Sequence, residues 1–328
     1  MDDQPDSVLR QAQDADQPEP VEAESAEAGP VEEHEITAKI DTEELRREWQ
    51  ERADRARKVR VCSLLGARTD LGRVRENNED KFEFFQPDDE NTLAVKGSFY
   101  AVADGMGGHS AGQIASELAL ETVVKAYYAD PSPVVVESLR SAIQQANALI
   151  FDAARAVSDR SGMGTTFTGL VIRGEEAFIA QVGDSRCYLA RGHNIRQITQ
   201  DHSWVAEQVR RGALSEDEAL MSPFRNVITR SLGNFPNVDV DIFTEQIKPG
   251  DEFLLCTDGL SGEVGPEEML EAMRGRSPSQ AAWDLVELAL ERGGHDNATV
   301  LIVAIKDIIK ENRTRRRRGF GALLSGKQ

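Results

Sequence analysis

Two long amphipathic stretches, at about 110–128 and 133–157, stand between groups of short apolar runs that have the composition of β-strands. The stretches carry apolar residues at three- and four-residue spacing, which is typical of helices that pack one face on another layer. The short runs gather on both sides of this pair instead of alternating with single helices. This order favours packed sheets covered by helices over repeated βαβ units. We therefore expect an α+β fold.

The predicted strands fall into three groups along the chain. VRVCSLLGA, KFEFFQ and SFYAVADG precede the helical pair, and TTFTGLVI, EAFIAQVGD, CYLARG and NIRQIT follow it. A polar helix-forming region at about 201–222 comes next, followed by VDVDIFTEQI and EFLLCTDG. Two helical segments cover about 266–290, and NATVLIVAIK is the last strand. Bounding turn residues and β-type composition support these assignments.

The three cysteines indicate thiols that are buried and reduced. Cys62, Cys187 and Cys256 are far apart, and each lies in an apolar, strand-like run. They show no metal-ligand spacing such as C-x-x-C, and their number is odd. A chain of 328 residues with 40% hydrophobic residues can bury enough apolar surface to fold without disulfides.

Charge is spread unevenly over the chain. The net charge of −19 divides into −11 for residues 1–36, +1 for residues 37–58, about −15 for residues 59–309 and +6 for residues 310–328. Nonspecific binding to nucleic acid requires a basic surface that displaces counterions from phosphates. The acidic body therefore argues against a nucleic-acid partner, and it is typical of a protein that concentrates carboxylates, as around cations.

Composition divides the chain into four parts. Residues 1–40 are predicted to be a disordered acidic tail, because they hold almost no large apolar residue. Residues 41–58, DTEELRREWQERADRARK, are predicted to form a charged helix or linker, and residues 59–309 the folded domain. Residues 310–328 form a basic tail, which we expect to be disordered. A peripheral contact of this tail with anionic lipid or an acidic partner is the alternative.

The location predicted from sequence is cytoplasmic. No apolar run approaches the roughly 20 residues needed to span a bilayer. The first residues, MDDQPDSVLR, lack the basic region and apolar stretch of a secretory signal. We expect a monomer without a membrane span.

Four acidic sites stand beside glycine or asparagine at the ends of predicted strands. They occur in RENNEDKF, AVADGMGG, LLCTDG and GGHDNATV, and their acids are Glu79, Asp80, Asp104, Asp258 and Asp296. Such placement puts carboxylates at the rim of a sheet, where several anions close together repel one another strongly. A hard cation removes this repulsion, and oxygen ligands suit Mg²⁺ or Mn²⁺. One Asp-Gly pair alone indicates only a turn, so the prediction depends on the whole set.

The set also carries a family resemblance. TDLGRVRENNEDKF, ADGMGGHSAG, GMGTT, VGDSR, TDGL and GGHDNATV occur in the order of the metal-dependent protein phosphatases of type 2C, and the chain resembles their bacterial form over 59–309. The resemblance implies a four-layer αββα fold, with a central antiparallel β-sandwich flanked by helix pairs. It implies a protein serine/threonine phosphatase that hydrolyses phosphoserine and phosphothreonine with metal-activated water at a binuclear Mn²⁺ or Mg²⁺ centre. Phosphoproteins, including a cognate serine/threonine kinase, would be its partners, and it would reverse kinase signalling.

Roles for individual residues follow from the same resemblance. Asp104 would bridge two cations with help from the Gly105 carbonyl. Asp258 and Asp296 would hold the first cation, and Glu79 the second through water. Asp80 would orient a metal-bound water, and Asp159 would join Asp258 around a third, weaker site. Arg75 would grip the substrate phosphate, since a guanidinium offers a bidentate fork that matches phosphate oxygens. The catalytic residues would thus be Arg75, Asp80 and Asp104.

The chain departs from the family pattern at two positions. Met106 stands where some eukaryotic members carry a histidine proposed as general acid, which leaves water, or His109, His202 or His295, as the proton donor. Thr257 replaces the commoner serine before Asp258, and we expect no effect on the site. Asp184 in VGDSR is expected to make a structural pair or turn hydrogen bond.

Residues 201–234 correspond to the mobile flap of bacterial members. This segment, called the flap below, is expected to tune substrate choice. Its cationic side chains are Arg210, Arg211, Arg225 and Arg230.

Two other classes of function stay open on the sequence. One is a degenerate phosphatase that only docks phosphoproteins, which the complete acidic set disfavours. The other is a different two-metal hydrolase such as a nuclease, whose polyanionic substrate the acidic body disfavours.

Overall fold

The computed structural model describes residues 59–310 except 109, 158, 159 and 161, together with Glu43, Arg47 and Glu51. These residues all belong to one unit, Thr42–Gln328. The three isolated positions fall in the predicted 41–58 helix, and they are helical and exposed. The predicted acidic tail, the rest of the 41–58 segment and residues 311–328 lie outside the described residues.

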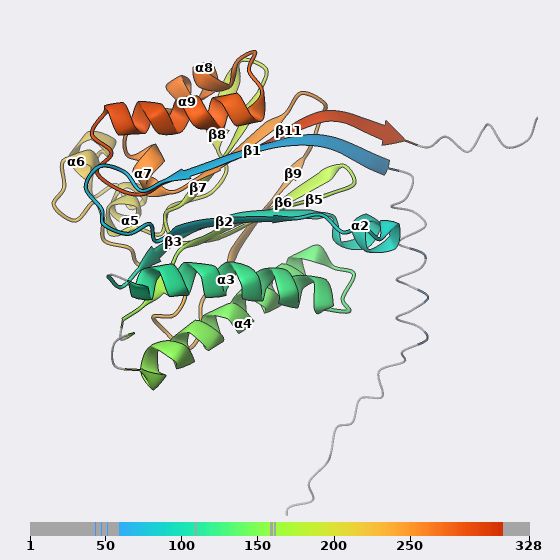
Figure 1. The fold of residues 1–328 in the computed structure, drawn as a ribbon, viewed down its shortest axis with the longest axis horizontal. Coiled ribbons are helices and arrows are strands. Elements are labelled where there is room, and N and C mark those ends of the chain that lie inside the picture. Colours follow the sequence, from blue (N-terminus) through green and yellow to red (C-terminus); the bar gives the residue numbers. More distant parts are fainter. Residues whose placement is uncertain are drawn as a thin grey trace, which may run out of the picture. The chain divides into compact units, whose positions relative to one another are not determined.

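Two antiparallel sheets form the centre of the fold (Figure 1). The first sheet has the order β1 (Val59–Asp70), β11 (Ala298–Lys310), β10 (Glu252–Cys256), β7 (Arg186–Arg191) and β8 (Asn194–Gln197). The second sheet has the order β2 (Asp80–Phe85), β3 (Ser98–Met106), β5 (Phe167–Arg173), β6 (Glu176–Val182) and β9 (Asp241–Gln246), and β4 (Gly164–Thr165) pairs with β3. Apolar side chains from both sheets interlock between them, among them Val102, Leu170, Phe253 and Leu301.

Helix pairs cover the outer faces of the two sheets. Helices α3 (Ser110–Ala129) and α4 (Val135–Ala156) pack on the second sheet, and α8 (Pro266–Met273) and α9 (Pro278–Glu291) pack on the first. The remaining helices are α2 (Glu90–Lys96), α5 (Trp204–Arg210), α6 (Glu216–Leu220) and α7 (Asp258–Ser261). The four-layer αββα architecture expected from the sequence is confirmed.

The structure differs from the sequence expectations in details of its helices. Helix α2 was not predicted, because seven residues are too few to show a helical period. Its start is set by Asp89, whose side chain accepts a hydrogen bond from the Thr92 N–H at 2.8 Å. The flap forms two short helices, α5 and α6, in place of one longer region. Among the described helices, none combines the length and apolar character that a bilayer crossing requires.

The cysteines are all free thiols. Cys187 and Cys256 are fully buried, and burial raises the pKa of both. Cys62 is only half-buried. Two of the three therefore match the expectation of buried, unreactive thiols.

Lys96 is a buried cation inside the second sheet's helical cover. Its side chain is 1% exposed and donates to the Ser132 carbonyl at 2.7 Å and to Ser138 Oγ at 2.8 Å. Its own carbonyl accepts the hydroxyl of Tyr127 at 2.6 Å. Burial lowers the pKa of Lys96 to about 8. The ammonium group is thus hydrogen-bonded, although removing it from water has a cost.

This environment gives a pH-dependent prediction. Between pH 8 and 10.5 the unfolded chain holds a proton on Lys96 that the folded chain has released, so Lys96 adds stability as pH rises. The difference in unfolding free energy between wild type and Lys96→Met should grow in favour of wild type by about 1.4 kcal/mol from pH 7 to pH 9. Urea titrations at the two pH values measure it, and taking the difference cancels the titration of the cysteines. A pH-independent difference would contradict the assignment.

Candidate metal centre

Acids from both sheets meet at one end of the sandwich. Asp80 begins β2 and is the direct cross-strand partner of Asp104 near the end of β3. In the first sheet, Asp258 follows β10 by two residues and Asp296 precedes β11 by two. Because β10 and β11 are antiparallel neighbours, the end of β10 and the start of β11 lie together, and so do these two acids. Figure 1 shows the start of β2, the end of β3 and α7 at this end of the fold.

A hydroxyl group joins the two sheets beneath the acids. Thr257 Oγ1 donates to Asp80 Oδ2 at 2.7 Å and accepts the N–H of Thr299 at 3.0 Å. The side chain of Thr299 makes a further hydrogen bond to Asp80. Thr257 and Asp80 lie 177 residues apart in sequence. The threonine at position 257, noted as a mild departure from the family, is thus a direct support of Asp80.

The carboxyl groups of Asp104 and Asp258 lie close enough to influence each other's pKa. Burial is the main cause that raises the pKa of each, and the nearby acids raise the pKa of both further, Asp80 for Asp104 and Asp296 for Asp258. The pKa of Asp80 is likewise raised, chiefly by burial. At neutral pH this cluster therefore has too little positive charge nearby to balance its carboxylates.

Several carboxylate oxygens in this region lack a hydrogen-bond partner. Among the described residues, the buried Oδ1 atoms of Asp80, Asp184 and Asp258 have none. A buried polar atom without a partner is costly, and an anionic one more so. Oxygen donors of this kind, already crowded together, fit a hard divalent cation such as Mn²⁺ or Mg²⁺.

The described acids lie close together, but they do not form a complete set of metal ligands. Within the part of the chain that is described, no three or more carboxylate, imidazole or thiol groups already have the geometry of a metal site. Asp296 is turned toward Arg75, whose Nη2 lies 2.6 Å from Asp296 Oδ2. Even so, Asp296 is close enough to contribute to the raised pKa of Asp258 and of Asp104. The acids are therefore near neighbours, as a shared cation site requires.

Glu79 is positioned through its backbone. Its carbonyl accepts the Gly105 N–H at 3.2 Å and the Ser116 hydroxyl at 2.6 Å. Its N–H donates to Asn297 Oδ1 at 2.8 Å. The side chain lies over the start of α3, where a Cβ on Gly112 would be 2.1 Å from Glu79 Oε2. Glycine at position 112 leaves the room that this carboxylate occupies.

Asn297 is a supporting residue that the sequence interpretation treated only as a flank of Asp296. Its side chain donates to the carbonyls of Leu71 and Asn77 at 2.8 and 3.0 Å while accepting from Glu79. These bonds attach the 71–79 loop to the start of β11. The available signal was a polar residue directly before an apolar strand, in HDNATV.

Arg75 stands beside the acids. Its hydrogen bond to Asp296 is the main cause that raises its pKa, with Asp104 and Glu79 adding to the effect. The side chain is half-exposed. A guanidinium that touches the carboxylates and reaches solvent is placed to meet an incoming anion.

Asp184 is closer to the acids than its predicted structural role suggested. It is buried, and burial together with repulsion from Asp258 raises its pKa to about 8. It makes a hydrogen bond to its own backbone, in line with the expected turn bond. Its second oxygen belongs to the partnerless set described above. Nothing in the local sequence VGDSR indicates that Asp258 lies next to it.

The remaining predicted residues are placed unequally. Gly105 pairs with Thr165 of β4 beside the acids. Asp159 and His109 lie outside the described residues. His295 is exposed, with Nδ1 2.9 Å from Glu263 Oε1. His202 is buried at the base of the flap and engaged on both ring nitrogens, which does not suit a general acid.

The flap carries exposed apolar side chains, and its arginines differ in their contacts. Arg230 is paired with Asp241 at 2.9 Å, whereas Arg225 is exposed and makes no ion pair with any described residue. Arg210 donates to the Asp201 carbonyl, and Arg211 is 3.6 Å from Glu207. The exposed apolar side chains are those of Leu220, Met221, Phe224 and Val227. Arg230 thus belongs to the flap base, and Arg225 is the arginine most available to a ligand.

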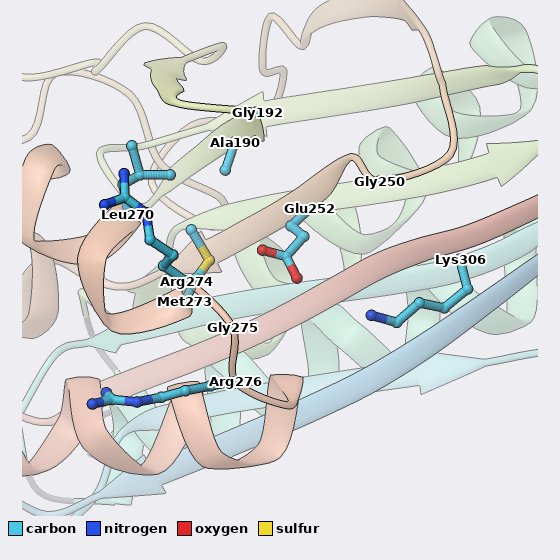
Figure 2. A pocket seen from close by; sticks show the side chains of 10 residues that line it. All are labelled: Ala190, Gly192, Gly250, Glu252, Leu270, Met273, Arg274, Gly275, Arg276 and Lys306. Atoms are coloured by element: carbon cyan, nitrogen blue, oxygen red, sulfur yellow. The ribbon is translucent and has the colours of Figure 1, made fainter.

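A hollow of about 400 Å³ lies elsewhere, between the first sheet and α8 (Figure 2). Glu252 and Lys306 line it together with Met273, and burial raises the pKa of Glu252. Arg276, on its rim, is paired with Asp284 at 2.6 Å. None of the predicted site residues lines this hollow, so it is separate from the acidic centre.

Comparison with known proteins gives a consistent family. The family model described as protein phosphatase 2C matches residues 67–298. A serine/threonine phosphatase stp of Listeria monocytogenes is 38% identical over 251 residues, which cover 75% of this chain and 97% of the relative.

Solved structures agree. The structure of the S. agalactiae serine/threonine phosphatase superposes with a TM-score of 0.69 at 31% identity, covering 75% of this chain and all of that one. The catalytic domain of the phosphatase PstP, solved in complex with two manganese ions, gives a TM-score of 0.66 at 33% identity over 76% of this chain and 100% of that chain. The chain therefore belongs to the protein phosphatase 2C family in its bacterial form, and it is a metal-dependent protein serine/threonine phosphatase.

Proposed function

We propose that the acids at the end of the sandwich hold two divalent cations, Mn²⁺ or Mg²⁺, at which phosphoserine and phosphothreonine are hydrolysed. The observation that carries the proposal is the convergence of buried, partnerless carboxylate oxygens from both sheets. Asp104 would bridge the two cations with the Gly105 carbonyl. Asp258 and Asp296 would complete the first site and Glu79 the second. Asp159 would join Asp258 in a third, weaker site.

Bound cations would lower the pKa of a water molecule and offset charge on the phosphate. The chain's own residues would do the rest. Asp80 has one oxygen fixed by Thr257 and the other without a partner, so it could accept a hydrogen bond from the attacking water and orient it. Arg75 would bind two phosphate oxygens and hold the phosphorus in line for attack. No cysteine nucleophile is required, in keeping with the burial of Cys187 and Cys256.

The biological setting follows from the activity. We propose that the phosphatase domain spans 59–309, acts as a monomer in the cytoplasm and reverses phosphorylation by a cognate serine/threonine kinase in a signalling pathway. The flap would choose among phosphoproteins through Arg225 and its exposed apolar side chains. A manganese-dependent assay with a phosphothreonine peptide, para-nitrophenyl phosphate and a phosphodiester tests the activity. Hydrolysis of the diester alone would overturn it.

Asp104→Asn should abolish turnover while keeping the fold. We expect a loss of about three orders of magnitude or more in kcat, because a central ligand and its charge disappear. In chelator at pH 7 the variant should melt at a higher temperature than wild type, since it removes a buried acid whose raised pKa costs stability there. Manganese titration by calorimetry gives a readout without turnover, and exposed Asp152→Asn is the control. Near-normal kcat in Asp104→Asn would remove Asp104 from the mechanism.

Arg75→Ala should weaken substrate use mainly through KM. Loss of a bidentate phosphate contact is expected to lower kcat/KM for a phosphopeptide by about 10- to 100-fold, with Arg75→Lys between the two. Arg73→Ala, at an exposed neighbouring arginine, is the matched control. Steady-state kinetics decide the matter, and equal effects at positions 73 and 75 would count against a specific phosphate contact.

Arg225→Glu should change peptide preference without changing the chemistry. We expect kcat/KM to fall for phosphopeptides with acidic flanks and to rise for those with basic flanks, because the charge of the exposed flap is reversed. A panel of phosphopeptides measures the preference, with para-nitrophenyl phosphate as the reference substrate. An unaltered ranking of peptides would show that the flap does not select them through this residue.

A further inference from the structure

The flap leaves and re-enters the fold at one narrow point. Ser203 and Ile228 form an antiparallel bridge, and the Trp204 N–H donates to the Val227 carbonyl at 2.8 Å. One residue further out on each arm, the Thr229 N–H donates to the His202 carbonyl, also at 2.8 Å. Residues 203–228 therefore form a closed loop whose orientation depends on what holds its base. The base includes His202 on the outgoing arm and Arg230 on the returning arm.

His202 is bonded on both ring nitrogens. The Gly183 N–H donates to His202 Nδ1 at 3.0 Å, and the His202 N–H donates to the Gly183 carbonyl at 2.9 Å. Because Nδ1 accepts, the ring proton lies on Nε2, which donates to Asp241 Oδ2 at 3.0 Å. The histidine is 3% exposed. It thus connects the turn after β6 with the first residue of β9.

Asp241 also holds the returning arm. Its Oδ1 accepts from Arg230 Nη1 at 2.9 Å, while its Oδ2 accepts from His202. The same guanidinium donates to the Asp239 carbonyl at 3.3 Å. One carboxylate therefore clamps both arms of the flap to the edge strand of the second sheet.

Both arms also continue to the acids of the metal centre. Beyond Gly183, Ser185 Oγ is 2.7 Å from Thr166 Oγ1, which accepts the Asp104 N–H at 2.8 Å. On the returning arm, Leu232 exchanges two backbone hydrogen bonds with Thr165, and Thr165 pairs with Gly105. The second connection does not use His202, so the fold keeps one anchor for the flap if the histidine is changed.

We propose that His202, with Asp241 and Arg230, is a positioning residue. It sets the orientation of the flap relative to the metal centre, so that a phosphorylated protein segment lying on the flap presents its phosphate to Arg75. The inference rests on the proposed function, in which the flap contacts protein substrates. A small phosphate ester does not reach the flap, so its hydrolysis is independent of the clamp. The clamp therefore selects for protein substrates without taking part in the chemistry.

The two functions of the imidazole can be separated by substitution. Asparagine offers an acceptor at the position of Nδ1 and keeps the Gly183 bond, but it cannot reach Asp241. Glutamine offers a donor at the position of Nε2 and keeps the Asp241 bond, but it has no acceptor for Gly183. Each should restore part of what His202→Ala loses. A residue that only filled space would not show this pattern.

Kinetics of the full chain with manganese test the proposal. In His202→Ala we expect KM for a phosphothreonine peptide to rise about tenfold, with kcat for para-nitrophenyl phosphate within about twofold of wild type. His202→Asn and His202→Gln should lie between. Asp241→Ala, at a partly exposed position, should repeat the split if His202→Ala is not obtained folded. Exposed His193→Ala and Asp239→Asn are the matched controls.

Hydrogen exchange gives a readout that does not depend on activity. Amides of residues 203–228 should exchange faster in His202→Ala than in wild type, and those of β3 should not. Parallel losses with both substrates, or an unchanged peptide KM, would overturn the proposal. An inactive wild-type chain would count against the proposed function, while unchanged exchange in the flap would refute the clamp itself.

Discussion

The central constraint on this structure is that two sheets hold several carboxylates together against their mutual repulsion. Asp80 and Asp104 come from one sheet, and Asp258 and Asp296 from the loops of the other. Burial raises the pKa of the first three, so the protein bears a cost for keeping them near one another. Such a cost is sustained only where surrounding structure fixes the groups. A hard cation would offset the repulsion between these carboxylates. The same carboxylate cluster that destabilises the fold therefore supports the function.

The fixing is done by neutral hydrogen bonds rather than by opposite charges. Thr257 joins Asp80 to the first sheet, and Asn297 ties the loop before Glu79 to the start of β11. Neutral donors of this kind orient a carboxylate without neutralising it, so its charge stays available to a cation. Arg75 is the exception, because it is charged and half-exposed beside Asp296. Its position suits exchange of that carboxylate for a phosphate.

The flap shows the same division between rigid base and open tip. Its base is bonded through His202 and Asp241 to both the metal side and the sheet edge, while its tip exposes Met221 and Phe224. A rigid base with a variable tip lets substrate preference change without disturbing the acids. Figure 1 shows helices α5 and α6 of the flap at the same end of the sandwich as α7, which begins at Asp258.

Sequence alone predicted the succession of the longer strands and helices and the acids at the strand ends, because period and turn residues are local properties. Arg75 was singled out only by the family resemblance of the motifs. The four-layer fold followed from the family resemblance that these motifs carry. Helix α2 was missed, since seven residues, about two turns, are too few to show a readable period. Only the tertiary structure decided that Thr257 supports Asp80, that Asp184 lies beside Asp258 and that His202 is a clamp instead of an acid. Those relations join residues from different sheets and loops, and no local pattern encodes which distant backbone will supply a partner once the sheets pack.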